Sequence, residues 1–320
     1  MALTKVSNSM LVQPVNHNIL INPSFTVKQR GDVIDHDVIS YGPDRWRIRG
    51  SDTVGGTKVE SSTEVEDATG INKLVVKHEG TTSGTAYIYQ FIEAVNIQGL
   101  YSKEMTFSFG YSDVGGSGIP KVRISSYNSS AASKDLYDAV PTSLGDNRWT
   151  CTVTLSTADG TAPDPSERGL QVLVWPNEKN PPSAKWSVWE TKLEVGSVVT
   201  PFIARPYSEE LALCQRYYYR TPLVSGGYYS TGLTTSATSC RYVIQYPVEM
   251  RSPPSGTAYG SFQNGGMLAP DITSFAFAQT SSIYSLMLGG STSPAMTGGQ
   301  AVQLRNKNDA TAYLEFDAEL

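Results

Sequence analysis

Short stretches of alternating apolar and polar residues recur along this chain, and between residues 73 and 193 no helical period interrupts them. They predict strands at residues 73–77, 86–91, 105–111, 121–126, 149–155, 170–175 and 186–193. The segments between them are rich in turn formers, such as 79–84 (EGTTSG) and 114–118 (VGGSG). Short strands at this spacing predict an all-β protein built around a two-sheet β-sandwich.

The chain has 320 residues, which exceeds one typical domain and favours two separate cores. All five tryptophans precede residue 190, and shorter strands are predicted at 241–246, 274–279, 283–288 and 312–318. We therefore divide the chain into a leader (1–18), a larger β-domain (19–207), a linker helix (208–220) and a smaller β-rich domain (221–320).

Charge and cysteine content exclude several classes of protein. A formal net charge of −5 without a basic block argues against nucleic-acid binding. No apolar run is long enough to span a membrane, so membrane insertion is not expected. Cys151, Cys214 and Cys240 are widely spaced and form no Cys-x-x-Cys pattern. They are interpreted as buried free thiols, which fits assembly in a reducing cytoplasm.

One helix is predicted, from Ser208 to Arg220. Ser208 is a favourable N-cap residue, and the two glutamates that follow it lie where the helix dipole favours anions. Leu211, Cys214 and Tyr218 share one face of this helix at helical spacing.

The most specific segment of the chain is its junction, residues 190–220, which reads ETKLEVGSVVTPFIARPYSEELALCQRYYYR. It resembles the junction in tail-fibre, tailspike and other appendage proteins of tailed bacteriophages. In those proteins Leu-Glu-x-Gly, Thr-Pro-Phe and Arg-Pro-Tyr lead into a helix that reads Glu-Leu-x-Leu-Cys-Gln-Arg-Tyr-Tyr. The matching positions here are 193–196, 200–202, 205–207 and 210–218.

This resemblance implies a virion protein that trimerises about a three-fold axis. Leu211, Tyr217 and Tyr218 are the residues expected at that interface, where tyrosine supplies both apolar area and a hydroxyl. An alternative interpretation of the tyrosines after residue 216 is a platform for glycan binding.

The start of the chain carries two further resemblances. Residues 1–18 resemble the leader of phage spike and fibre proteins, which implies virion docking through Val6, Met10 and Leu11. The alternative is a frayed terminus. Residues 18–25 (NILINPSF) resemble the first strand of jelly-roll carbohydrate-binding modules, and residues 44–46 resemble their Asp-x-Trp turn. The larger domain is therefore predicted to be a jelly-roll of the carbohydrate-binding-module type.

Catalytic motifs are absent from the sequence. It contains three histidines and neither a Gly-x-Ser-x-Gly elbow nor a His-Glu-x-x-His pattern. Glycoside hydrolysis needs two carboxylates across a sugar cleft. The chain has 30 acidic residues, so the sequence does not exclude such a pair. Polysaccharide-degrading spikes usually carry a long β-helix, however, and this chain has no such repeat. We predict a non-enzymatic protein; release of reducing sugar from host polysaccharide would reveal a depolymerase.

Asp32, Asp35 and Asp37, with Asp44 nearby, form an acidic cluster before Trp46. Jelly-roll carbohydrate modules often hold a structural calcium ion, which prefers oxygen ligands. The favoured interpretation is a solvated loop. No cofactor is predicted, and a structural calcium ion stays open.

Aromatic residues are the best candidates for sugar contact, because their faces pack against the C–H face of a sugar ring. Trp175 stands at the lip of the polar loop 176–182, so it is predicted to bind glycan, with Asn177 and Tyr127 as further candidates. The aromatic residues of two strands are instead assigned to the core: Tyr87, Tyr89 and Phe91 on one, and Phe107, Phe109 and Tyr111 on the other.

The predicted function is that of a tail fibre or receptor-binding protein that adheres to host-surface polysaccharide without catalysis. Its predicted partners are two further copies of itself, other virion proteins through the N-terminus, and the glycan. Its predicted location is the virion. The alternative is a purely structural virion component, such as an adaptor, head fibre or decoration protein, that contacts only other virion proteins.

Overall fold

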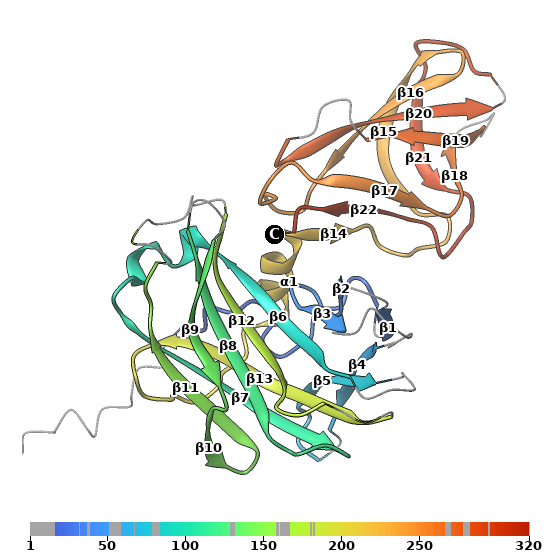
Figure 1. The fold of residues 1–320 in the computed structure, drawn as a ribbon. Coiled ribbons are helices and arrows are strands. Elements are labelled where there is room, and N and C mark those ends of the chain that lie inside the picture. The colour runs from blue at the N-terminus through green and yellow to red at the C-terminus, as the bar shows by residue number, and fades with distance from the viewer. Residues whose placement is uncertain are drawn as a thin grey trace, which may run out of the picture. The chain divides into compact units, whose positions relative to one another are not determined.

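The chain forms two compact units in a computed structural model: an N-terminal unit that ends at Tyr207 and a C-terminal unit from Ser208 to Glu319 (Figure 1). The structure describes residues 17–319 except 32, 37–38, 51–58, 67, 79–83, 129–131, 158–159, 161–166, 180, 182, 266–269, 278–281 and 294. The predicted docking residues Val6, Met10 and Leu11 lie outside the described residues.

The N-terminal unit is a jelly-roll β-sandwich of two antiparallel sheets, so the predicted all-β fold is confirmed. One sheet has the order β1 (Val33–His36), β4 (Val59–Val65), β5 (Asn72–His78), β13 (Lys185–Val195), β7 (Glu104–Val114), β11 (Arg148–Thr154) and β10 (Thr142–Gly145). The other has the order β2 (Ile39–Tyr41), β3 (Arg47–Gly50), β6 (Ala86–Glu93), β12 (Arg168–Pro176), β8 (Pro120–Tyr127) and β9 (Ser133–Ala139). Two short 3-10 turns, η2 (Ala94–Asn96) and η3 (Gln98–Leu100), follow β6.

The core of the N-terminal unit lies between the two sheets. On β7 the rings of Phe107, Phe109 and Tyr111 are fully buried in it, as predicted. Small or polar residues occupy the alternate positions of β7, so only one of its faces offers a large apolar surface. The rings of Trp46, which directly precedes β3, and of Trp186 on β13 fill the same core.

Residues 18–25, predicted to form the first strand, are instead irregular. Asn22 and Phe25 adopt left-handed φ values of 54° and 56°, which no strand accommodates. The side chain of Asn22 organises this segment, because its amide donates to the Val27 carbonyl oxygen (2.9 Å) and accepts from the Val27 amide (3.1 Å). The apolar residues of this segment favour a strand, but the hydrogen bonds of Asn22 stabilise a turn in its place.

The junction sequence contains a buried ion pair on β13, the last strand of the N-terminal unit. Lys192 and Glu194 are 2% and 0% exposed, and Lys192 Nζ lies 3.2 Å from Glu194 Oε2. Thr200 donates to the same carboxylate from its backbone nitrogen (2.9 Å) and its hydroxyl (2.5 Å). Arg205 reaches back and donates to the carbonyl oxygen of Leu20 (3.0 Å). These contacts give a structural reason for the spacing of Lys192, Glu194, Thr200 and Arg205 in the junction sequence.

Replacing Arg205 with alanine is expected to destabilise the N-terminal unit by about 1–3 kcal/mol, because a buried carbonyl oxygen loses a charged donor. Differential scanning calorimetry measures the effect. The matched control is Arg241→Ala, which removes an exposed arginine from the C-terminal unit. Equal melting temperatures for the two variants would contradict this role of Arg205.

The C-terminal unit combines a closed barrel with a small sheet. The barrel has the order β15 (Tyr228–Ser236), β16 (Ser239–Gln245), β20 (Ser285–Ser293), β19 (Asp271–Ala276), β18 (Phe262–Gly265) and β21 (Ala301–Asn306). The sheet has the order β14 (Tyr218–Arg220), β22 (Tyr313–Asp317) and β17 (Ser255–Tyr259). Tyr242, Leu288, Leu304 and Phe316 are among the buried residues of its core. Arg251 ties this unit to its C-terminal segment by donating to the Ala318 carbonyl oxygen (2.7 Å).

The predicted helix is shorter than expected. Helix α1 spans Tyr207–Gln215, and Tyr218 already belongs to β14, where it pairs with Asp317. The Tyr218 hydroxyl also donates to Glu315 Oε2 (2.8 Å). The helix ends before Tyr218 because the backbone there pairs with β22. The helices of the described chain fall short of the length and apolarity that a membrane span requires.

Two of the three predicted interface residues are buried within the single chain. Tyr217 and Tyr218 are 1% and 3% exposed, which leaves them almost no surface for a symmetry mate. This corrects their assignment as interface residues. Leu211 is only partly buried and keeps surface for such a contact.

The three cysteines are free and buried, as predicted. Burial raises the pKa of the Cys151 thiol to about 12, so it stays protonated at neutral pH. We expect the folded protein to react with a disulfide reagent such as DTNB at pH 8 far more slowly than the unfolded protein, in which all three thiols react. Rapid labelling of the folded protein would contradict the buried placement.

Candidate functional site

The aromatic side chains of β6 lie on the outer face of the six-stranded sheet; Tyr89 and Phe91 are buried, as predicted, but outside the core cluster between the two sheets. Ile88 and Ile92 point into the sandwich and belong to its core, whereas Tyr87, Tyr89 and Phe91 occupy the alternate positions. Successive residues of a strand face opposite sides, so these three rings point away from the core.

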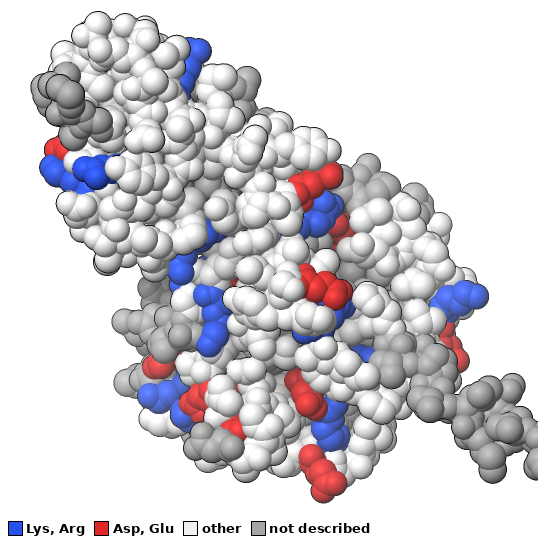
Figure 2. Space-filling view, turned by 180° about the vertical axis from the view of Figure 1, so that it is seen from behind, with Lys and Arg blue, Asp and Glu red and all other residues white. Residues whose placement is uncertain are grey.

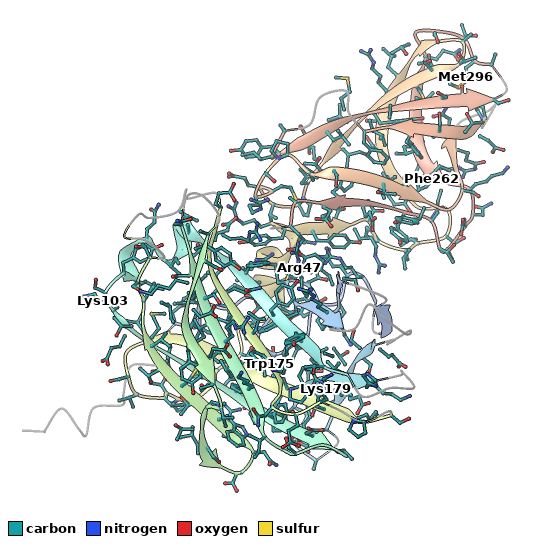
Figure 3. The ribbon with its side chains drawn as sticks, viewed as in Figure 1. Arg47, Lys103, Trp175, Lys179, Phe262 and Met296 are labelled. Atoms are coloured by element: carbon teal, nitrogen blue, oxygen red, sulfur yellow. The ribbon has the colours of Figure 1, made fainter. Side chains whose placement is uncertain are left out.

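Neighbouring strands add side chains to the same face. Tyr89 pairs with Arg47 of β3 and with Leu173 of β12, and Trp175 of β12 pairs with Lys121 of β8. Arg47 and Trp175 are labelled in Figure 3. We call this surface the aromatic face and define it by the following residues: Tyr41, Arg47, Arg49, Tyr87, Tyr89, Phe91, Lys121, Arg123, Tyr127, Arg168, Gln171, Leu173 and Trp175.

Phe91 is the centre of one ring cluster on the aromatic face. Its ring centroid lies 5.5 Å from that of Tyr89 and 5.9 Å from that of Tyr127, both in edge-to-face geometry. Two guanidinium groups also approach it, that of Arg168 at 5.0 Å and that of Arg47 at 5.4 Å from the centroid. Cation–π contacts of this kind hold arginine side chains in place.

Trp175 is the centre of a second cluster. Its ring packs on Tyr87 with centroids 5.3 Å apart. Lys121 Nζ and the Arg123 guanidinium lie 5.4 Å and 5.7 Å from its centroid. Both clusters therefore pair aromatic surface with basic groups, and both draw side chains from β6, β12 and β8.

Hydrogen bonds fix the polar groups between the rings. The Tyr127 hydroxyl donates to Gln171 Oε1 (3.1 Å), and burial raises the pKa of Tyr127, so its phenol stays neutral. Arg47 Nε donates to the Tyr41 hydroxyl (2.7 Å). Burial alone would lower the pKa of Arg47, but its interactions with Tyr41 and Tyr89 raise it above the ordinary value. Arg47 is thus held as a cation.

The carboxylates beside this face are on β9, where they pair with basic residues. Asp138 lies 2.8 Å from Arg123 Nη2 and 3.1 Å from Lys121 Nζ. Burial raises the pKa of Asp138, but hydrogen bonds from Arg123 and Lys121 outweigh it and hold the pKa below its usual value. Asp135 lies 3.5 Å from Arg123 Nε. These charges form a network at one margin of the face.

The structure brings two of the three predicted glycan-binding residues together. Trp175 and Tyr127 lie on the aromatic face, Trp175 at 7% exposure and Tyr127 partly exposed. Asn177 follows the end of β12, where its backbone amide donates to the Ile119 carbonyl oxygen (2.9 Å), and its side chain is exposed. Sequence reasoning missed Phe91 and Arg168, which strand register places beside Tyr127, and Arg47, which it places beside Phe91.

The predicted acidic cluster is only partly described. Asp44 is buried, accepts hydrogen bonds from the Gln29 backbone (3.0 Å) and side chain (2.5 Å), and has Arg30 Nη1 at 3.8 Å. Asp32 and Asp37 lie outside the described residues, as does the side chain of Asp35. Within the described part of the chain, no group of three or more His, Cys, Asp or Glu residues could hold a metal. Both carboxylate oxygens of Asp44 accept these hydrogen bonds from Gln29, and a calcium ion in this cluster stays a prediction.

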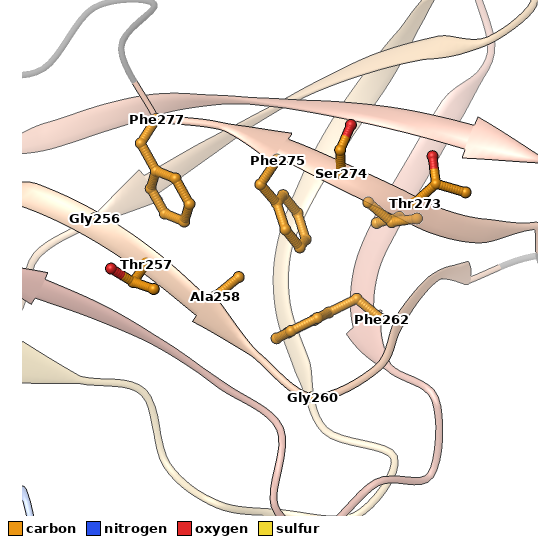
Figure 4. Close-up of a pocket in the computed structure, with 10 residues that line it drawn as sticks. Gly256, Thr257, Ala258, Gly260, Phe262, Thr273, Ser274, Phe275 and Phe277 are labelled. Atoms are coloured by element: carbon orange, nitrogen blue, oxygen red, sulfur yellow. The ribbon is translucent and has the colours of Figure 1, made fainter.

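The C-terminal unit contains a pocket of about 340 Å³ between β17 and β19. Phe262, Phe275 and Phe277 line it, and the rings of Phe275 and Phe277 point from the β19 side toward β17 (Figure 4). A side chain on Gly256 would overlap the Phe277 ring, so glycine is required there. The lining residues are uncharged, and the hydroxyls of Thr257, Thr273 and Ser274 lie beside the phenylalanine rings.

Charged residues elsewhere are dispersed. Figure 2 shows Lys and Arg interspersed with Asp and Glu over a mainly uncharged surface on the side of the molecule seen there. On that visible side, no broad patch of one sign suggests an electrostatic footprint for nucleic acid.

No protein-family model matches the chain, and no curated protein matches its sequence. Among solved structures, it is similar to a putative sugar-binding protein from Bacteroides thetaiotaomicron, with 13% identity, 56% of this chain and 100% of that chain covered, and a TM-score of 0.34. The xylan-binding CBM22-1 domain of Paenibacillus barcinonensis Xyn10C shows 12% identity, coverage of 53% and 97%, and a TM-score of 0.31.

A third similar structure is the enzymatically active domain of tailspike protein 4 from bacteriophage CBA120, with 9% identity and a TM-score of 0.31. The alignment covers 56% of this chain and 21% of the tailspike chain, so the chain spans about a fifth of that protein. TM-scores at this level assign neither a shared family nor a shared function.

Proposed function

We propose that this chain is a non-enzymatic phage virion appendage, a tail fibre or receptor-binding protein, that adheres to host-surface glycan through the aromatic face. The observation that carries the proposal is the gathering of Phe91, Tyr127 and Trp175 on one outer sheet face, with arginines and Gln171 between them. Polar edges beside aromatic planes are what a sugar ring requires, since its C–H face packs on rings and its hydroxyls take hydrogen bonds.

The aromatic face also suits a long ligand. Its residues come from β2, β3, β6, β12 and β8, so the two ring clusters lie across several adjacent strands. A polysaccharide could occupy both clusters with successive sugar units. Weak binding at each copy is sufficient if three copies act together, because linked sites raise avidity without new contacts.

The virion setting rests on the resemblance of residues 190–220 and of the leader to phage appendage proteins. Deleting residues 1–16 is expected to leave a folded homotrimer that no longer enters virions. The deletion must stop before Asn18, whose amide donates to the Thr191 carbonyl oxygen (2.9 Å) and whose side-chain oxygen accepts from the Leu193 amide (3.1 Å). Light scattering and particle incorporation measure the two outcomes, and normal incorporation would contradict a docking role.

The alternative, a structural component that contacts only virion proteins, is favoured by one observation. Tyr89, Phe91 and Trp175 are each under a tenth exposed, at 6%, 7% and 7%, because basic groups and other rings cover them. A homotrimer that binds no glycan on an array or on host cells would establish this alternative.

A further inference from the structure

The aromatic face carries more positive than negative charge, although the whole chain is negative. Its basic residues are Arg47, Arg49, Lys121, Arg123 and Arg168. Two of them, Lys121 and Arg123 on β8, pair with Asp135 and Asp138 on β9. The remaining basic residues of the face are Arg47 and Arg49 on β3 and Arg168 on β12.

Arg168 is the key residue of this charged region. Its guanidinium lies 5.0 Å from the Phe91 centroid and 5.6 Å from the Tyr127 centroid, and its side chain is partly exposed. Among the described residues, no carboxylate forms an ion pair with it. Glu93, its register partner on β6, is 1% exposed. Two rings thus orient a planar cation whose charge the described chain does not neutralise directly.

The Arg47 guanidinium lies 5.4 Å from the centroid of the same Phe91 ring, and its Nε donates a hydrogen bond to the Tyr41 hydroxyl. Arg168 is partly exposed beside the nearly buried Phe91 ring, so a ligand at this position can reach the N–H groups of Arg168. A neutral sugar would use this arrangement poorly, whereas a planar carboxylate matches the two-pronged donor geometry of arginine.

We infer that the aromatic face selects acidic polysaccharide, with a sugar carboxylate bound by Arg168 beside Phe91 and Tyr127. This inference rests on the proposed function and adds the class of glycan. The neighbouring Tyr127–Gln171 hydrogen bond then offers a hydroxyl and an amide to the same sugar unit. The Trp175 cluster would hold an adjacent unit of the polymer.

The test is a titration of the full-length protein with three polymers: polygalacturonate, its fully methyl-esterified form, and dextran sulfate. The first two share one backbone and differ in whether the carboxylate is free or methyl-esterified, and the third supplies a non-planar anion. We expect polygalacturonate to bind, the ester to bind at least about 10-fold more weakly, and dextran sulfate to bind more weakly than polygalacturonate at equal salt. The wild-type protein serves throughout, so this comparison does not depend on a variant that folds.

A pair of variants then locates the contact. Arg168→Gln is expected to weaken polygalacturonate binding by about 10-fold or more while the melting temperature stays near that of wild type. Arg241→Gln removes an equal charge from an exposed site in the C-terminal unit and is expected to bind as wild type does.

The outcomes separate this inference from the proposed function. Equal binding of the acid and the ester, stronger binding of dextran sulfate, or wild-type affinity of Arg168→Gln would overturn carboxylate selection and leave glycan adhesion standing. Binding of a neutral glycan alone on a broad array would do the same. A failure to bind any glycan would overturn the proposed function and this inference together.

Discussion

Replacing Glu194 with alanine is expected to destabilise the N-terminal unit by about 3–5 kcal/mol, because the buried Lys192 ammonium loses its carboxylate and keeps only uncharged acceptors from Thr200 and Pro201. The two Thr200 donors lose their acceptor as well. Typical domains are stable by only about 5–15 kcal/mol, so the loss would bring the unit close to unfolding at physiological temperature. Chemical denaturation followed by tryptophan fluorescence measures it, since all five tryptophans belong to the N-terminal unit.

Two controls separate the buried pair from ordinary salt bridges. Glu64→Ala breaks the exposed Glu64–Lys185 pair, whose side chains are 54% and 47% exposed, and should change stability by no more than about 1 kcal/mol. The double variant Lys192→Met, Glu194→Leu removes both buried charges and should be much more stable than Glu194→Ala. If Glu194→Ala unfolded at the same denaturant concentration as Glu64→Ala, the structural explanation of the junction sequence would be wrong.

Replacing Trp175 with alanine is expected to weaken glycan binding by about 30-fold or more, which corresponds to about 2 kcal/mol, the size of a binding hot spot. The ring supports Tyr87 and contacts Lys121 and Arg123, so its loss disturbs the whole second cluster. Trp175 lies outside the sandwich core cluster, so the fold should survive.

Trp189→Ala is the matched control. Trp189 is 8% exposed, compared with 7% for Trp175, and it also contacts a basic residue, with Lys73 Nζ 4.4 Å from its ring centroid. Trp189, on β13, packs over Gly110 of the neighbouring strand β7. Both strands belong to the seven-stranded sheet, so Trp189 lies away from the aromatic face. Both variants lose a similar buried ring, but only Trp175→Ala should lose glycan binding. Equal losses would show that the effect comes from stability and not from contact.

Sequence patterns were sufficient to predict strands but not always their faces. On β7 the residues that alternate with Phe107 and Phe109 are Thr106, Ser108 and Gly110, so only the aromatic side can form a core. On β6 the residues that alternate with the rings include Ile88 and Ile92, so both faces are apolar. Periodicity gives the spacing of such a strand, but the neighbouring sheet decides which side is buried.

Contacts between distant residues explain the other differences. Tyr218 continues the helical pattern of α1, yet it joins β14 because Asp317, about a hundred positions later, supplies a strand partner. Arg168 and Arg47 are unremarkable in sequence and become parts of one site only through the register of β12 and β3 with β6. Local propensity carries no information about such pairings, and the candidate site depends on them more than the fold class does.

The most direct test of the central claim is a glycan array probed in one buffer with wild-type protein, Trp175→Ala and Trp189→Ala. The aromatic face as a glycan-binding surface predicts that wild type and Trp189→Ala bind the same defined sugars, that free sugar competes, and that Trp175→Ala loses the signal. The claim would be contradicted by a folded wild-type protein that binds no glycan, or by a Trp175→Ala variant that binds as well as wild type.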